Sequence, residues 1–386
     1  MRKPGIQAVG TWSGGRFMHF GEAVSEERLE TLIRPGDGID TVLTADVYGA
    51  GEADSLLGKA LASCDLPRDE YCVIGAVGHD FYEGERQGAK GFPRFTDPAL
   101  REPGEYLDYL RMATERSLER TGLDRFDALL LHNPDRIGFT SELVWEGMRA
   151  LRDEGLTGAI GVAPGPANGF TLDVIDCVER FGSEIDYAML ILNPLEPWPG
   201  EMALGACEQS GVEVITRVVD YGGLFWDDLL SPEDLGERDH RAFRPDGWIE
   251  SGRERIESIR GIAERHGLTL LQTACQWNLA QPAVSCVAPT LVQEAGPDAR
   301  TVESKREELA SLPAEIGLSP DEIEEIRRIG DNRGCMALKG ASPVHEGDER
   351  PDGWEMRPDL FDTASRWGID PDRDLVMSAS RTSAGK

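Results

Sequence analysis

The chain has 386 residues, and its apolar share of 40% is enough for one large α/β barrel or two ordinary domains. Its 70 acidic and 40 basic residues give a net charge of −30. A surface this negative repels phosphate backbones and anionic lipids, which argues against nucleic-acid and membrane partners. We find no transmembrane run, no signal-peptide pattern and no Cys-x-x-Cys among seven cysteines, so we expect a cytoplasmic protein with free thiols. The few lysines also suit a salt-rich cytoplasm.

Short apolar runs alternate with longer amphipathic stretches up to about residue 330. The runs predict eight strands, at residues 6–10, 39–43, 71–77, 126–131, 158–162, 186–192, 212–218 and 283–287. The amphipathic stretches predict helices at residues 25–34, 53–62, 106–120, 141–153, 172–181, 202–210, 253–266 and 270–279. Repeated strand–helix units indicate parallel strands, and eight of them favour a closed (β/α)8 TIM barrel over an open doubly wound sheet.

Two segments lie outside this repeat. Residues 78–104 are long, polar and rich in Gly and Pro, and they follow the third strand, so we expect them on the catalytic face of the barrel. Residues 331–386 follow the barrel, which we assign to residues 1–330, and they contain a predicted short helix at 360–367. We expect this C-terminal extension to pack on the barrel without forming an independent domain.

Several motifs along the barrel resemble one enzyme family. Residues 38–49 read Gly-Ile-Asp-Thr-Val-Leu-Thr-Ala-Asp-Val-Tyr-Gly, similar to the aldo–keto reductase signature in which a strand ends in Asp-Thr-Ala and a Tyr-Gly follows. Further similar stretches lie at residues 10–12, 56–61, 117–132, 151–155 and 160–162. They cover about residues 5–330 in the order of one barrel. The resemblance implies that fold, with the chemistry at the C-terminal ends of the strands.

By this resemblance, Tyr48 corresponds to the family's catalytic acid and His132 to the histidine that orients the carbonyl. The family's Asp and Lys, which lower the pKa of the tyrosine, correspond to Leu43 and Ala76. A phenol with no adjacent ammonium stays protonated at neutral pH and can donate a proton, and a neutral histidine can accept one. We therefore predict Tyr48 and His132 as an acid/base pair.

The positions that correspond to the family's cofactor contacts differ as well. Gly-Val-Ser-Asn becomes Gly-Val-Ala-Pro at residues 161–164, a glutamine becomes Met189, and the tyrosine that stacks on nicotinamide becomes Arg217. The phosphate loop corresponds to residues 289–294, which hold an acid and no cation for a phosphate group. We therefore expect no cofactor. The alternative is NADP held by substitute residues.

Polar and aromatic residues after several strands predict a pocket for a small-molecule substrate. Its candidate residues are Trp12, His79, Asn193, Glu196, Arg217 and Asp220. Arg217 could neutralise a carboxylate or enolate, or it could form an internal pair with Asp220. A loop with Asp239, His240, Arg241 and Arg244 is long enough to cover the mouth, and residues 163–169 could present backbone N–H groups to an anion.

A metal site is a further candidate on the same face. His19, His79 and Asp80 would lie on its loops, and histidine and carboxylate groups can bind Zn²⁺. No His-x-x-x-His spacing supports such a site, so we predict no metal.

The leading hypothesis is a cofactor-independent enzyme with acid/base chemistry, of lyase, isomerase or hydrolase type, on a polar carbonyl or sugar-like substrate. The first alternative is a diverged NAD(P)H-dependent oxidoreductase, and the second is a non-catalytic binding or regulatory subunit. The fold alone does not choose among them, because one fold hosts many chemistries. Charged groups at the mouth favour an enzyme over a binding subunit, and the sequence leaves substrate and oligomeric state open.

Overall fold

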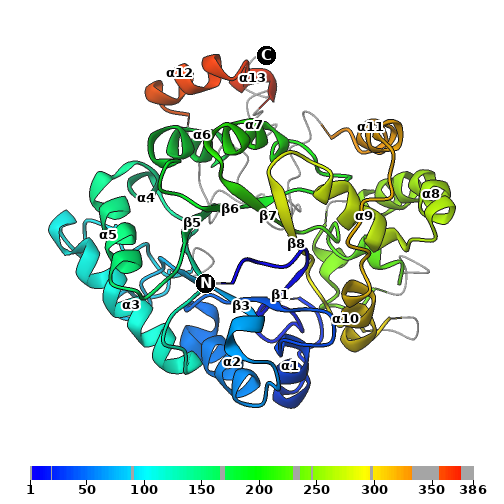
Figure 1. Ribbon diagram of the computed structural model, residues 1–386. Coiled ribbons are helices and arrows are strands. Elements are labelled where there is room, and N and C mark those ends of the chain that lie inside the picture. Colours follow the sequence, from blue (N-terminus) through cyan, green and yellow to red (C-terminus); the bar gives the residue numbers. More distant parts are fainter. Residues whose placement is uncertain are drawn as a thin grey trace.

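The computed structural model describes residues 2–18, 20–87, 91–165, 170–228, 235–244, 247–295, 299–332 and 356–374. Eight parallel strands form one sheet in chain order, surrounded by helices (Figure 1). They are β1 (Ala8–Gly10), β2 (Thr41–Leu43), β3 (Cys72–Val77), β4 (Ala128–His132), β5 (Ile160–Ala163), β6 (Tyr187–Ile191), β7 (Glu213–Arg217) and β8 (Val284–Ala288). A parallel bridge from Gln7 to Val287 joins the first strand to the last. The predicted (β/α)8 TIM barrel is confirmed.

Most helices follow the strands as the periodicity predicts, with some differences. They are α1 (Glu26–Ile33), α2 (Glu52–Ala62), α3 (Tyr106–Thr121), α4 (Arg136–Thr140), α5 (Glu142–Asp153), α6 (Phe170–Phe181), α7 (Glu201–Ser210), α8 (Trp248–His266), α9 (Leu270–Leu279), α10 (Val302–Ala310) and α11 (Pro320–Ile329). The short α4 was not predicted, and neither were α10 and α11. Helix α8 begins five residues earlier than expected, because Trp248 stacks on Tyr221 at 4.6 Å and Ile249 is buried.

Side chains alternate between the two faces of each strand, so every second residue points into the barrel. The interior is filled by an apolar cluster that includes Leu43, Ala76, Ala163, Met189 and Ala288, each near the C-terminal end of its strand. His132 and Arg217 share this inward orientation, because each lies two residues after a member of the cluster, Leu130 and Ile215 respectively. The inward residues at the strand ends therefore form the floor of the barrel mouth.

The C-terminal segment packs on the outside of the barrel. Helices α12 (Pro358–Arg366) and α13 (Pro371–Asp374) lie beside α6 and α7 (Figure 1). Leu360 and Ala364 are buried, and the indole Nε1 of Trp367 donates to Glu179 at 2.9 Å. The described residues after 355 thus contribute buried apolar side chains to this side of the barrel, and Arg366 forms an ion pair with Glu179.

No helix in the described ranges is long and apolar enough to cross a membrane. Six cysteines fall within these ranges, and all six are free thiols, as the scattered spacing predicts.

Candidate active site

Two predicted residues meet at the mouth of the barrel. Tyr48 begins a short turn after β2, and Gly49 follows at φ 61°, where an added Cβ would lie 2.8 Å from the Phe17 ring. His132 is the last residue of β4. The rings of Tyr48 and His132 are arranged edge to face, with centroids 5.7 Å apart, and Trp12 packs on Tyr48 at 6.3 Å. The structure therefore brings Trp12, Tyr48 and His132 together.

The surroundings of this pair favour neutral side chains. Burial raises the pKa of Tyr48, and the field of Arg217 partly opposes that rise. Burial also lowers the pKa of His132 well below its usual value, and His79, Arg94 and Arg217 lower it further. A protonated phenol can donate a proton, and a neutral imidazole can either accept or donate a hydrogen bond.

His79 stands next to this pair on the segment after β3. Its ring centroid is 5.0 Å from that of His132, and its Nδ1 lies 3.0 Å from Nη1 of Arg94. Burial and the Arg94 charge lower the pKa of His79 to about 3, so this ring is neutral at physiological pH. The segment turns at Gly78, where φ is 153° and an added Cβ would lie 2.8 Å from the carbonyl oxygen of His132. Residues of the 78–104 segment thus lie on the catalytic face, as predicted.

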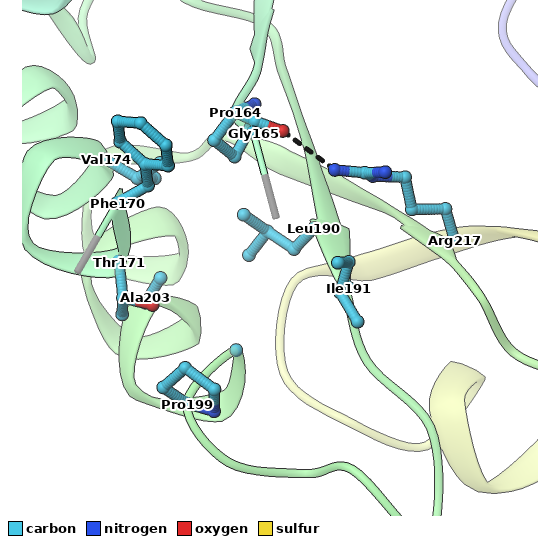
Figure 2. A pocket seen from close by; sticks show the side chains of 11 residues that line it. Pro164, Gly165, Phe170, Thr171, Val174, Leu190, Ile191, Pro199, Ala203 and Arg217 are labelled. Atoms are coloured by element: carbon cyan, nitrogen blue, oxygen red, sulfur yellow. Dashed lines mark hydrogen bonds between the residues drawn. The ribbon is translucent and has the colours of Figure 1, made fainter. Parts of the chain in front are cut away.

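Arg217 reaches the mouth from the other side. It ends β7, and its Nη2 donates to the carbonyl oxygen of Pro164 at 2.8 Å, which fixes the guanidinium across the end of β6 (Figure 2). The same arginine borders a mostly apolar pocket between β6, α6 and α7. The pocket is lined by Pro164, Gly165, Phe170, Thr171, Val174, Leu190, Ile191, Pro199, Gly200, Ala203 and Arg217. Residues 166–169 of the predicted anion loop lie outside the described ranges.

The other three substrate candidates are Asn193, Glu196 and Asp220, and their side chains form hydrogen bonds that hold loops together. The Asp220 carboxylate accepts the backbone N–H groups of Gly223 at 2.9 Å and Thr290 at 2.8 Å, which links the loops after β7 and β8. The Asn193 side chain accepts the N–H of Glu196 and donates to its carboxylate, both at 2.9 Å. All three are buried, and their role in substrate binding stays a prediction.

The residues considered for a metal are engaged or not described. The Asp80 carboxylate accepts the N–H groups of Tyr82 and Glu83 and pairs with Arg101. His19 lies outside the described ranges. Within those ranges, no three His, Cys, Asp or Glu side chains gather closely enough to hold a metal ion.

Cations that the sequence did not reveal adjoin the loop after β8. Lys305, on α10, donates from Nζ to the carbonyl oxygen of Val292 at 2.9 Å. Arg28, on α1, donates from Nη2 to the side chain of Gln293 at 3.1 Å. Both come from helices far from the loop in the chain, so no local motif could indicate them. Two cations from other elements therefore adjoin a loop that has none of its own in residues 289–294.

A buried charge network continues from Lys305. Its ammonium lies 2.6 Å from Asp228, and Nη1 of Arg241 lies 3.0 Å from the same carboxylate. Arg241 also pairs with Asp239 at 2.8 Å, so the loop predicted to cover the mouth is tied to the β7 and β8 loops. In the same loop, the guanidinium of Arg244 lies 4.8 Å from the Trp248 ring centroid.

The chain is similar to proteins of known name. A probable voltage-gated potassium channel subunit beta from Arabidopsis thaliana is 21% identical over 337 residues, which cover 84% of this chain and 94% of that protein. D-threo-aldose 1-dehydrogenase from a Pseudomonas species is 26% identical over 261 residues, which cover 65% of this chain and 74% of that protein. The crystal structure of an aldo/keto reductase from Klebsiella pneumoniae in complex with NADP and acetate is 20% identical, with a TM-score of 0.55 over 84% of this chain and 90% of that one.

These similarities correct two expectations from the sequence. The relative named as a dehydrogenase and the similar barrel crystallised with NADP show that the expectations of cofactor-independent chemistry and of no cofactor were wrong. The same similarities favour the first alternative, a diverged NAD(P)H-dependent oxidoreductase. The error came from judging a cofactor site by side chains at single aligned positions. Arg28 and Lys305 adjoin the β8 loop in space, although the loop itself has no cation in residues 289–294.

The family assignment rests on most of the chain. The aldo/keto reductase family model matches residues 8–330, which include all eight strands and both members of the Tyr48–His132 pair. This chain therefore belongs to the aldo/keto reductase family.

Proposed function

We propose that this protein is a nicotinamide-dependent oxidoreductase that interconverts the oxidised and reduced forms of a small polar carbonyl compound, such as an aldose. The observation that carries the proposal is the edge-to-face pair of Tyr48 and His132, 5.7 Å apart at the mouth of the barrel. The similarity to an aldose dehydrogenase supports the redox reaction and the substrate class. Trp12 and His79 flank the pair, and both are largely shielded from solvent.

The proposed roles follow from the protonation states. Tyr48 is protonated at neutral pH, so its phenol can give a proton to the carbonyl oxygen during reduction and take it back during oxidation. His132 is neutral, and its buried Nδ1 has no hydrogen-bond partner among the described residues. A ring nitrogen of His132 can therefore hold the substrate oxygen beside the phenol. The chemistry that a bound nicotinamide supplies is the hydride.

The residues that adjoin the β8 loop support the cofactor assignment. Arg28 and Lys305 lie beside this loop, and Arg28 is the more accessible of the two to a phosphate group. Both already face carboxylates, Glu303 at 2.7 Å from Arg28 and Asp228 at 2.6 Å from Lys305. Because these carboxylates compete with a phosphate group for the same cations, NADH and NADPH both belong in the experiment.

The experiment measures oxidation of NADPH and NADH with a panel of aldehydes and aldoses, and the reverse reaction with the corresponding alcohols. We expect turnover with at least one pair, and Tyr48→Phe and His132→Ala should each lower kcat by roughly a hundredfold. Tyr71→Phe is the matched control, because Tyr71 precedes β3 at the opposite end of the barrel. Absence of cofactor-dependent turnover across the panel, or near-full activity in a folded Tyr48→Phe protein, would overturn the proposal.

A further inference from the structure

Arg94 is placed at the mouth of the barrel by the segment that follows β3. The chain leaves the barrel at Gly78 and returns at Phe95, whose backbone N–H donates to the carbonyl oxygen of Gly78 at 3.0 Å. His79 and Arg94 form an antiparallel bridge between the outgoing and the returning chain. Because side chains alternate along an extended chain, Phe95 points the other way, where it is buried against α3. Arg94 therefore lies beside His79, on the side of the segment that faces His132.

Three contacts fix the guanidinium of Arg94 close to His132. Its Nε donates to the carbonyl oxygen of Asn133, the residue after His132. Its Nη1 lies 3.0 Å from Nδ1 of His79 and 3.3 Å from the carbonyl oxygen of Phe92. The centroid of the His79 ring in turn lies 5.0 Å from that of the His132 ring. Two of these acceptors are carbonyl oxygens and the third is a neutral imidazole, so the contacts position the guanidinium without neutralising its charge.

A second cation approaches His132 from the opposite side. Strand β4 lies between β3 and β5, and His132 at its end pairs with Ala163 in β5. Arg217 is held on the carbonyl oxygen of Pro164, the residue after Ala163, at 2.8 Å (Figure 2). Arg94 is anchored in the same way on the residue after β4. The two guanidinium groups are therefore fixed one residue beyond the paired ends of β4 and β5.

The positive charge at the mouth is accessible to a small ligand. Both guanidinium-bearing side chains and His132 are half-buried, so each keeps some contact with solvent. The carboxylates of the neighbouring loops are engaged, since Asp80 pairs with the buried Arg101 and Asp135 accepts the Thr96 hydroxyl at 2.7 Å. The chain as a whole has a net charge of −30, so fixed cations at its mouth run against its general charge and indicate a negatively charged ligand.

We propose that Arg94 is the specificity-determining residue for carbonyl substrates that also carry a carboxylate. The carboxylate pairs with the guanidinium of Arg94, while the carbonyl oxygen of the same substrate lies against Tyr48 and His132. A guanidinium holds a carboxylate through charge-assisted hydrogen bonds, and the contacts with Asn133 and His79 order this one before the substrate arrives. The substrate class rests on the proposed function, whereas the binding of a carboxylate at Arg94 does not.

The first test compares the turnover of three acids with that of their neutral counterparts. The acids are glyoxylate, 4-oxobutanoate and D-glucuronate, and the counterparts are acetaldehyde, butanal and D-glucose. We expect kcat/KM to be roughly tenfold to a hundredfold higher for at least one acid than for its counterpart. Arg94→Gln and Arg94→Met should abolish this preference, mainly through KM, because both remove the charge. Arg94→Lys should keep part of it, because lysine retains a charge but not the planar fork.

Arg111→Gln is the matched control, because Arg111 lies on α3 outside the barrel and donates to Glu154 at 2.9 Å. It removes the same charge and should leave the preference for the acid unchanged. Two neutral variants at position 94 keep the test usable if one of them folds poorly, and the preference of the wild-type protein needs no variant.

Three results of this test would overturn the proposal. The first is a wild-type protein that prefers none of the acids. The second is an equal loss for acids and neutral compounds in Arg94→Gln, because that would mean that Arg94 only supports the segment after β3. The third is a stronger preference for D-glyceraldehyde 3-phosphate over glyceraldehyde than for any of the acids, because the ligand group would then be a phosphate.

The second test measures binding without turnover, by isothermal titration calorimetry with and without NADP. The probes are glycolate and 4-hydroxybutanoate, the reduced forms of the two smaller acids, and their uncharged analogues ethylene glycol and 1,4-butanediol. At least one acid should bind more tightly than its analogue, and Arg94→Gln should weaken that acid by roughly tenfold or more. Acids that bind no better than the analogues would overturn the proposal. Arg94-dependent binding in a protein without nicotinamide-dependent turnover would keep the carboxylate site and refute the proposed oxidoreductase function.

Discussion

Replacing the buried Asp228 by asparagine should destabilise the protein strongly, whereas the same change at its exposed neighbour Asp227 should not. Asp228 holds Nζ of Lys305 at 2.6 Å and Nη1 of Arg241 at 3.0 Å, and the side chains of all three residues are almost fully buried. Asparagine keeps the shape but leaves the Lys305 ammonium without its counter-charge. Removal of one partner from a buried ion pair costs about 3–5 kcal/mol. Asp227 pairs with Arg260 at the surface, so Asp227→Asn should lower the free energy of unfolding by less than about 1 kcal/mol.

The assay is urea unfolding of both variants, followed by tryptophan fluorescence and circular dichroism. The urea concentration at the unfolding midpoint should fall for Asp228→Asn. The slope of the unfolding free energy against urea concentration should not change, which indicates a change in stability alone. Burial would raise the pKa of Asp228, but the charges of Lys305 and Arg241 outweigh burial and lower it. The stabilisation is therefore present at neutral pH and is lost as pH falls through the folded pKa, so the two proteins should converge in acid. Equal and small losses of unfolding free energy in Asp228→Asn and Asp227→Asn would refute this reasoning.

Two further predictions concern pH. Burial, then repulsion from Asp54, raises the pKa of Asp46 well above its usual value, and neither carboxylate oxygen has a hydrogen-bond partner among the described residues. Because the folded state holds the proton more tightly, stability falls as pH rises above the unfolded pKa of about 3.9, and Asp46→Asn should stabilise the protein more at neutral pH than in acid. An equal effect of Asp46→Asn on the urea midpoint at both pH values would contradict this. The folded pKa of His79 is about 3, so stability should be lost as pH falls from about 6.5 toward that value, and His79→Asn should reduce this loss. An unchanged acid sensitivity in His79→Asn would show that the ring is charged or exposed in the folded protein.

The barrel and the Tyr48–His132 pair could be predicted from the sequence because both depend on order along the chain. Apolar runs of strand length, repeated eight times, place consecutive strands side by side, and parallel strands bring their C-terminal ends to one edge. Tyr48 follows β2 and His132 ends β4, so the fold alone brings them to the same mouth. The prediction of Arg217 at this mouth had the same basis, since Arg217 ends β7.

The cations near the β8 loop could not be predicted in this way. Lys305 and Arg28 reach the loop from α10 and α1, and their positions depend on how those helices pack on the barrel. The charge network of Asp228 and Arg241 likewise joins loops that have no fixed spacing in the sequence. The expectation of no cofactor counted only the charges within residues 289–294, and it was overturned by the similarity to an aldose dehydrogenase and to a barrel crystallised with NADP.

The most direct test of the central claim is the transfer of deuterium from the nicotinamide ring to the product. The protein is incubated with NADPH deuterated at both C4 positions and with the best carbonyl substrate of the panel, and the product is analysed by mass spectrometry. We predict that the product carries one deuterium at the former carbonyl carbon and that its formation is roughly a hundredfold slower in Tyr48→Phe. Product that forms at the same rate without the cofactor, or that carries no deuterium, would contradict the assignment of this protein as a nicotinamide-dependent oxidoreductase.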